Sequence, residues 1–261
     1  MIRIIKWEWF RLKSYRSFWT FNLGYVICLS MTVWMGARLI EFFLQQSAVS
    51  EFQSLIGQPS LQLYPFFFYF SGFFEPILAF SIMGLSIKER ELGVLKQHVI
   101  DGFSKEELLL GKFFQACLLT IFAWITLVIL IQVFAGLNTS EFFQKWKELA
   151  GVALRCGGIL SFGLFVALLI PRSIGAVTIF IAWSVLIEPF LGYFLEWNFE
   201  WSVKKYFPMQ VFSHLIDSPS QLLGVSVEKA MEQNLSFPGL AALYILIFWG
   251  GMYLYTKLKD V

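Results

Sequence analysis

The segment KERELGVLKQHVIDGFSKEELLLGK, residues 88–112, holds ten of the chain's 38 formally charged side chains, which comprise 20 basic and 18 acidic residues. It lies between two long apolar segments. A mixed-charge cluster at 88–91 is followed by Gly93, where a bend is expected, and by Val94–Ile100, a short helical stretch of apolar and polar residues. Asp101-Gly102 is typical of a turn. The segment therefore predicts a short helix between two turns, with an apolar helix attached at either end.

Ser104 and Glu107 mark the start of the helix that follows. They have the spacing of a capping box, in which the Ser hydroxyl accepts from the third amide onward and the Glu side chain reaches back to the cap. The new helix runs through Leu108–Leu110 into the next apolar segment. A short helix of this size fits a groove on a partner protein, and a partner that moves it can pass force into the two attached helices.

The composition indicates a membrane protein. Hydrophobic residues make up 57% of the 261 residues and charged residues only 15%, whereas soluble domains usually carry about 25% charge. Mean hydropathy is +0.67, and the 30 Phe and 10 Trp exceed what a soluble core of this size needs. The fold class expected is an all-α polytopic membrane protein. Cys28, Cys117 and Cys156 all lie in apolar segments, so we expect packing residues rather than disulfides.

The apolar segments predict six transmembrane helices in a single transmembrane domain spanning residues 1–261. At a rise of about 1.5 Å per residue each is long enough to cross roughly 30 Å of hydrocarbon. The expected spans are Trp19–Gly36, Leu63–Ile87, Phe113–Ala135, Leu149–Ile170, Ile174–Leu195 and Leu240–Tyr255.

Residues 1–18 combine aromatic and aliphatic side chains with five Lys and Arg residues. We expect an interfacial helix on the cytosolic leaflet, with Trp at the level of the headgroups and the basic residues facing anionic lipid. The alternative is a basic flank that only sets the topology. This lead is long for a signal peptide, so the first span is expected to remain in the mature protein. One stripe at helical spacing comprises Ile2, Ile5, Trp9 and Leu12.

The distribution of Lys and Arg predicts the orientation. With the N-terminus inside, the inner segments hold thirteen of the 20 basic residues and the outer segments hold seven. Basic residues in short loops favour the cytosolic side, so both termini are expected in the cytosol.

The loop at 196–238 is the longest, and its apolar residues predict short helices at the outer membrane face. Pro208 is suited to open one that continues through His214 and Leu215. Asp217–Ser220 is typical of a turn, and Ser226 can cap a helix that runs to Glu232.

Three charged residues are expected inside spans, namely Glu75, Arg155 and Glu188. A charge at the bilayer centre costs about 2.5–3.5 kcal/mol, so each should pair, be protonated, or face protein or water. Pro76 and Pro189 follow the two glutamates and predict kinks. Because Arg155 and Glu188 fall at similar depth, we expect them to form an ion pair. The alternative is that Glu75 or Glu188 lines a substrate path.

The charged segment resembles a known family. The order E-R-E-x-G-V-L at 89–95, a short helix, and then G-F-S-K-E-E-L-L-L-G-K at 102–112 is similar to the cytosolic loop of ABC-2 type transporter permeases. Val94 stands where Thr is usual in that family, and Gly102-Phe103 replaces a common Pro-containing turn; neither change removes the geometry. The resemblance extends to the basic N-terminal helix, the six spans and the helices between the last two spans.

The resemblance implies a membrane permease subunit of an ATP-binding-cassette exporter in the cytoplasmic (inner) membrane of a bacterium. Its partners would be a cytosolic ABC ATPase subunit, a second permease subunit in a homo- or heterodimer, and membrane lipid, but no nucleic acid. ATP and Mg would bind to the ATPase, and this chain would hold no cofactor, metal or catalytic residue. The residues expected to contact the ATPase are Glu89, Glu91, Val94, Leu95, His98, Val99 and Asp101.

The residues themselves also argue against an ATPase domain in this chain. Gly111-Lys112 is followed by Phe113, and position 106 is Glu, so no G-x-x-x-x-G-K-[ST] phosphate-binding loop occurs there. ATP must then be hydrolysed by another polypeptide.

Three other functions stay open as alternatives. The chain could transmit ATPase force to a periplasmic partner without moving solute, or it could be a secondary transporter, although the two Glu-Pro pairs are the only hint of a repeat. A membrane-embedded enzyme would need clustered His, Glu or Asp, whereas His98 and His214 fall in different loops. The sequence does not identify the substrate.

Overall fold

Helices form all the regular secondary structure in the part of the chain that the computed structural model describes, which comprises residues 2–45, 59–135, 146–199, 204–216 and 236–258. In chain order the elements are α1 (Ile2–Ser14), α2 (Arg16–Gln45), α4 (Pro59–Ser71), α5 (Glu75–Glu91), α6 (Val94–Ile100), α7 (Lys105–Ala135), α9 (Trp146–Leu169), α10 (Ser173–Ile181), the π-helix η2 (Ala182–Ile187), α11 (Glu188–Phe199), the 3₁₀ helix η3 (Lys204–Tyr206), α12 (Pro208–Ser213) and α13 (Ser236–Leu258).

Six helical segments are long and apolar enough to cross a membrane, which confirms the predicted all-helical, six-span class. They are Arg16–Leu39, Phe66–Glu91, Lys105–Phe134, Trp146–Leu169, Ser173–Asn198 and Phe237–Leu258. Most ends lie within a few residues of the predicted ones. The largest difference is at the start of the third span, which begins at Lys105 rather than at Phe113.

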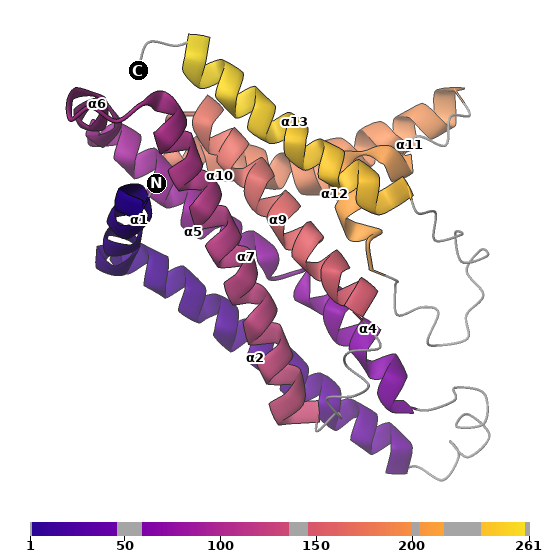
Figure 1. Cartoon of the computed structure of the whole chain (residues 1–261). Coiled ribbons are helices and arrows are strands. Elements are labelled where there is room, and N and C mark those ends of the chain that lie inside the picture. Colours follow the sequence, from indigo (N-terminus) through magenta and orange to yellow (C-terminus); the bar gives the residue numbers. More distant parts are fainter. Residues whose placement is uncertain (1, 46–58, 136–145, 200–203, 217–235, 259–261) are drawn as a thin grey trace.

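Helix α9 lies at the centre of the bundle. It packs against α4, α5, α7, α10, α12 and α13 (Figure 1). Its glycines allow close approach: a Cβ at Gly163 would stand 3.3 Å from Ala79 and Met83 of α5, and one at Gly158 would collide with the ring of Phe212 in α12. Small residues along α9 therefore let neighbouring helices approach its backbone.

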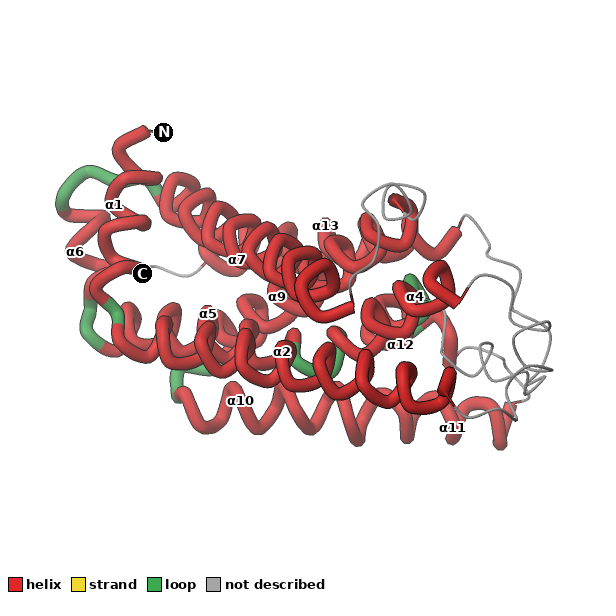
Figure 2. Tube along the Cα trace, turned by 90° about the horizontal axis from the view of Figure 1, so that it is seen from below, coloured by secondary structure: helices red, strands yellow, loops and turns green. Residues whose placement is uncertain are grey.

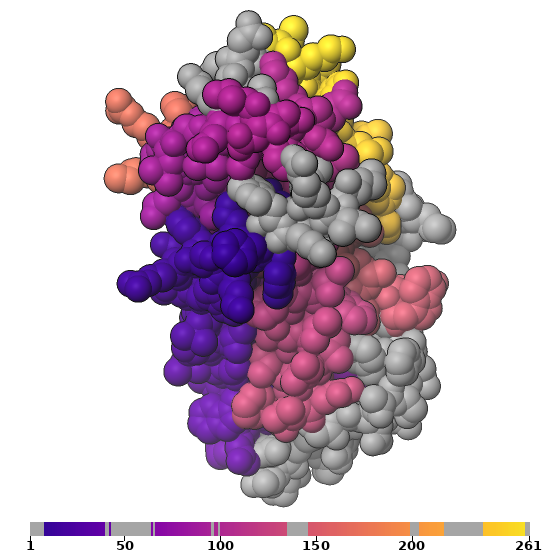
Figure 3. Space-filling model, turned by 60° about the vertical axis from the view of Figure 1, so that its left-hand side comes forward, coloured from indigo at the N-terminus to yellow at the C-terminus, as the bar shows by residue number. Residues whose placement is uncertain are grey.

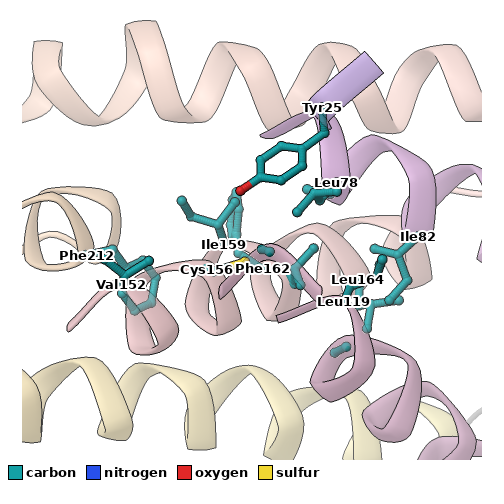
Figure 4. Packing of buried hydrophobic residues seen from close by; sticks show 14 of the residues in the cluster. Tyr25, Leu78, Ile82, Leu119, Val152, Cys156, Ile159, Phe162, Leu164 and Phe212 are labelled. Atoms are coloured by element: carbon teal, nitrogen blue, oxygen red, sulfur yellow. The ribbon is translucent and has the colours of Figure 1, made fainter. Parts of the chain in front are cut away.

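The apolar core is built around α9. In Figure 4 the ring of Tyr25, from α2, points toward α9, and Phe212 of α12 lies beside Val152. Large apolar side chains also cover much of the outer surface, for example along α10–α11, where Ile174, Val185 and Phe190 are exposed. Exposed apolar surface of this extent is expected of helices that face lipid.

The second span is interrupted rather than continuous. The predicted second span, Leu63–Ile87, corresponds to the apolar stretch Phe66–Glu91, but helix α4 ends at Ser71 and α5 begins at Glu75, so a break between two helices stands where a kink was expected. Turn hydrogen bonds join the two halves, including Phe74 N–H to the Ser71 carbonyl at 3.1 Å. Pro76 lies in the first turn of α5, where its missing N–H is tolerated, whereas within a continuous helix it would remove a backbone hydrogen bond.

The fifth span contains a turn of π-helix, η2, immediately before Glu188 and Pro189. Pro189 has no N–H to donate, which disturbs the α-helical pattern one turn earlier. The extra residue in a π turn changes the face that later residues present.

Helices α1 and α6 lie at the same end of the bundle (Figure 2), and we call this the α6 end. The last turns of α13 reach it too, because Tyr253 donates a hydrogen bond to Glu106 at the start of α7. In the space-filling view of Figure 3, the indigo N-terminal segment borders the magenta α5–α6 segment and the rose α7.

The loop between the fifth and sixth spans contains the predicted helix that begins at Pro208. This helix, α12, is not superficial: Val211 and Phe212 are fully buried against α9 and α13. The predicted turn at Asp217–Ser220 and the predicted helix from Ser226 to Glu232 lie outside the described residues.

Candidate functional site

Helix α6 is bracketed by two glycines in left-handed backbone conformations. Gly93 has φ 68° and Gly102 has φ 87°, which favour glycine because it lacks a Cβ. The Gln97 N–H donates to the Gly93 carbonyl at 3.2 Å, and the Asp101 N–H donates to the Gln97 carbonyl at 2.8 Å. The predicted short helix between two turns is therefore confirmed.

The predicted capping box at the start of α7 is also confirmed. The Ser104 hydroxyl accepts from the Glu107 N–H at 3.1 Å, and the Glu107 carboxylate accepts from the Ser104 N–H at 3.0 Å. This pair sets the direction of α7 as it leaves the loop.

The residues predicted to contact an ATPase occupy different environments. Glu91 and Asp101 are exposed, Val94 is half-buried, and Glu89 and His98 are buried. The side chains of Leu95 and Val99 lie outside the described residues. The predicted set is therefore not a single exposed surface.

Two apolar side chains that were not predicted are strongly exposed beside α6. Leu92 is 76% exposed and Ile100 is 83% exposed. Leu92 precedes Gly93 and α6, and Ile100 is the last residue of α6. The sequence could have indicated these two residues, since each is an apolar residue next to a glycine-containing turn.

Glu89 belongs to a buried cluster of charged and polar side chains that joins α1, α5 and α7. Its carboxylate pairs with the Arg11 guanidinium at 2.6 Å and with the Lys112 ammonium. Glu8 pairs with Arg11 and accepts from the Gln115 side-chain amide. Two acids and two bases balance, as a buried cluster requires. We call these five residues the α1–α5–α7 charge cluster.

Burial raises the pKa of Glu8 above its ordinary value of 4.5, and the nearby charges of Lys112 and Arg11 oppose that effect. The pattern of residues 1–18 predicted a basic interfacial helix or a basic flank, but not a buried carboxylate. Glu8 is the one acidic residue among the five Lys and Arg of this segment. A lone carboxylate among basic residues is suited to forming ion pairs, and this is the sequence feature that could have indicated the cluster.

Arg155 joins α9 to both halves of the interrupted span. Its Nη2 donates to the Phe68 carbonyl at 2.7 Å, to the Ser71 hydroxyl at 2.8 Å and to Glu75 Oε1 at 2.7 Å. Its Nε donates to both Glu75 oxygens at 3.0 and 3.1 Å. The guanidinium thus satisfies a carbonyl at the end of α4 and pairs with the carboxylate at the start of α5.

The predicted ion pair between Arg155 and Glu188 is therefore wrong, because the partner of Arg155 is Glu75. Glu188 is fully buried and accepts instead from the Trp183 indole at 3.1 Å and from the Gln210 N–H at 2.9 Å. Gln210 lies in the first turn of α12, so Glu188 holds α12 against the fifth span. Counting residues to estimate depth failed because the fifth span is not a regular α-helix: the π turn η2 lies immediately before Glu188 and changes the face that this residue presents.

A cavity of about 300 Å³ opens beside the Arg155–Glu75 pair. It lies between the interrupted span, α9, η2 and α12. Its lining includes the guanidinium of Arg155 and both apolar and polar side chains: Tyr69, Gly72, Phe73, Ile159, Ser184, Met209, Gln210, Phe212 and Ser213.

The fold and these sites define an all-helical protein with six helices suited to cross a membrane. The chain matches no protein-family model and no curated protein. The two sites, the α6 loop and the Arg155 cavity, lie at opposite ends of α5.

Proposed function

We propose that this chain is the membrane-spanning permease subunit of an ATP-binding-cassette exporter in a bacterial cytoplasmic membrane. In this proposal a separate cytosolic ATPase binds ATP and Mg, and a second permease subunit completes the pathway. The observation that carries the proposal is α6, a seven-residue helix held outside the six spans between two glycine turns. The exposed side chains of Leu92, just before α6, and Ile100, its last residue, supply apolar contacts for a groove on the ATPase.

The charge cluster supports a mechanical role for α6. Force applied to α6 reaches α5 and α7 through the chain itself, and Glu89 links α5 to Arg11 of α1 and Lys112 of α7. Because these contacts are buried, the end of α5 moves together with α1 and α7 rather than independently.

Helix α5 connects the proposed docking helix to the cavity. Its 17 residues extend about 25 Å, from Glu91 beside α6 to Glu75 beside Arg155. The break at 72–74 gives α5 a hinge at its far end, since turn residues absorb changes of backbone angle. Motion of α6 would therefore change the shape of the cavity, which is what a pump driven from the cytosol needs.

A secondary transporter is the second candidate function. The interrupted second span favours it, because discontinuous helices surround the binding sites of many such transporters. The two candidates differ in a simple respect, since only the first requires an ATPase.

The test is co-purification from native membranes in mild detergent, followed by identification of partners and measurement of ATP hydrolysis. The test variant carries Leu92→Asp and Ile100→Asp. The matched control is Leu258→Asp, which changes an equally exposed leucine (85%) at the end of α13. Each buried apolar side chain contributes about 1.5–3 kcal/mol, so each aspartate should weaken docking by about tenfold or more.

We expect a cytosolic ATPase to accompany the wild type and the control but not the double variant. If no ATPase accompanies the folded wild type, the ABC proposal fails and the secondary transporter takes its place. If the double variant retains the ATPase as well as the control does, α6 is not the docking helix.

A further inference from the structure

We propose that the cavity beside Arg155 binds a small apolar, uncharged molecule that carries a carbonyl-type acceptor, such as an amide or ester. Its role as the substrate site of an exporter rests on the proposed function, whereas the binding itself does not. The site is formed where the interrupted second span, α9 and α12 meet.

One guanidinium nitrogen of Arg155 is left for a ligand. The residue is only 4% exposed, and its Nε and Nη2 hold Glu75, Ser71 and the Phe68 carbonyl. Among the described residues, Nη1 has no hydrogen-bond partner. Its two N–H groups are therefore available as donors to a ligand.

Nη1 lies at the cavity wall formed by Gly72. A Cβ added to Gly72 would stand 2.8 Å from Nη1 and 2.7 Å from the central guanidinium carbon. Gly72 and Arg155 both line the cavity, so the absence of a side chain at position 72 keeps this nitrogen accessible.

Charge balance favours an uncharged ligand. The guanidinium of Arg155 is already neutralised by Glu75 at 2.7 Å. An additional anion would leave this buried site with a net negative charge, which carries a large desolvation cost. A neutral carbonyl oxygen can accept from Nη1 without that cost.

The rest of the lining fits an apolar body. Tyr69, Phe73 and Phe212 supply aromatic surface, and Ile159 and Met209 supply aliphatic surface. The Ser184 and Ser213 hydroxyls donate to backbone carbonyls, so their remaining lone pairs can accept from a ligand N–H or O–H. Mostly apolar walls with a few directed polar groups are typical of small-molecule sites, and about 300 Å³ is the lower end of their size range.

Position also matters, because the wall contains the hinge. Gly72 and Phe73 line the cavity and belong to the turn between α4 and α5. Met209 and Gln210 belong to α12, which Glu188 holds in place. A movement of α5 relative to α4 would thus change the ligand's surroundings directly.

The experiment uses benzophenone, a neutral aromatic ketone whose photoexcited carbonyl attacks nearby C–H bonds, preferentially those of methionine. The purified full chain in detergent, without any ATPase, is irradiated with the probe and the labelled peptide is mapped. We expect Met209 to carry the main label, because it shares the cavity with Nη1.

Two variants test whether the label depends on the cavity. Gly72→Ala should reduce labelling of Met209 by about fivefold or more, whereas Gly84→Ala, where an added Cβ meets nothing within 4 Å, should leave it unchanged. Ser184→Leu fills the cavity from η2 without touching the guanidinium and should give the same loss if Gly72→Ala fails to fold.

The anionic analogue 4-benzoylbenzoate distinguishes the ligand classes. Stronger labelling of Met209 by this carboxylate than by benzophenone would overturn the uncharged assignment. Label spread over lipid-facing residues and equal in all folded variants would overturn the site itself. Because no ATPase is present, neither result depends on whether α6 docks one.

Discussion

At the scale of single residues, Arg155 performs two tasks that the interruption of the second span creates. It donates to the Phe68 carbonyl near the end of α4, to which the Ser71 hydroxyl also donates, and it neutralises Glu75 at the start of α5. Removing one member of such a buried pair typically costs about 3–5 kcal/mol, because the other charge is left uncompensated. Replacing both removes that penalty.

This pair gives a first prediction. Glu75→Gln and Arg155→Met should each lower the thermal midpoint in detergent, and the double variant should be more stable than the sum of the two losses predicts. The recovery should be incomplete, because the Phe68 carbonyl and the Ser71 hydroxyl still lose the hydrogen bonds that Arg155 donates to them. Losses that simply add would show that Glu75 and Arg155 act independently.

His98 is the residue in the α6 loop whose protonation is most constrained. It is 7% exposed. Burial lowers its pKa below the ordinary value of 6.5, and the charge of Arg11 lowers it further. Among its other neighbours, Asp101 and Glu89 raise the pKa and Lys112 lowers it. The folded loop therefore disfavours the imidazolium.

The sign of the pH dependence follows from that shift. Because the folded pKa lies below the unfolded one, the stabilisation is present above pH 6.5 and is lost as the pH falls through the folded pKa. We expect amide hydrogen exchange at residues 97–103, corrected for intrinsic rates, to show less protection at pH 5.5 than at pH 7.5. The ring of His98 packs edge-on against Phe103 at 5.7 Å, so the loss should begin there.

His98→Asn is the control for this second prediction, because it removes the titrating group. Glu8, whose pKa is raised, stabilises the fold in the opposite direction, toward low pH, and its effect should remain in the variant. Equal loss of protection in His98→Asn and wild type would assign the pH dependence to another group.

At the scale of elements, the features that could be predicted are those formed by residues close together in the sequence. The capping box at Ser104 and Glu107 and the turns at Gly93 and Gly102 involve residues within a few positions of one another, so their patterns were sufficient. The ion-pair partner of Arg155 could not be predicted in this way, because it depends on how two helices are rotated about their axes. The break before Glu75 and the π turn before Glu188 both change that rotation.

Helix α12 gives a prediction at this scale, because one carboxylate holds its first turn. Glu188→Leu would leave the Trp183 indole and the Gln210 N–H without their acceptor, at a cost of about 1–3 kcal/mol for each buried donor. Val211, fully buried in α12, should then become accessible. In a cysteine-free background, Val211→Cys should react with a maleimide several times faster when Glu188→Leu is present.

Glu188→Gln is the matched control for α12, since the amide oxygen still accepts one of the two donors. It should give an intermediate or unchanged rate. If Glu188→Leu leaves the maleimide reaction unchanged, α12 is held by the packing of Phe212 against Gly158 rather than by the carboxylate.

At the scale of the whole molecule, composition and segment length were enough to predict six spans, because each span is a continuous apolar stretch. The central position of α9 was not predictable in the same way, since every span is apolar and only the small residues facing α5 and α12 distinguish it. The burial of Glu8 was missed for a related reason: α1 packs on α7, and that contact comes from tertiary structure.

Orientation is the property of the whole molecule on which the proposed function depends most. If all six candidate helices cross the membrane, the two termini lie on the same side, and α6 lies beside α1 at one end of the bundle (Figures 1 and 2). Thirteen of the 20 basic residues fall on this side, which the positive-inside rule places in the cytosol. An ATPase can reach α6 only if that assignment is right.

The last prediction tests this orientation with two exposed positions at opposite ends of the bundle. In a cysteine-free background, Gln97→Cys in α6 should react with a membrane-impermeant maleimide only after the cells are permeabilised, whereas Trp197→Cys in α11 should react in intact cells. Both should react in detergent, which controls for accessibility. The reverse pattern would place α6 outside the cell, where no ATP is available, and α6 could then serve only an extracytoplasmic partner.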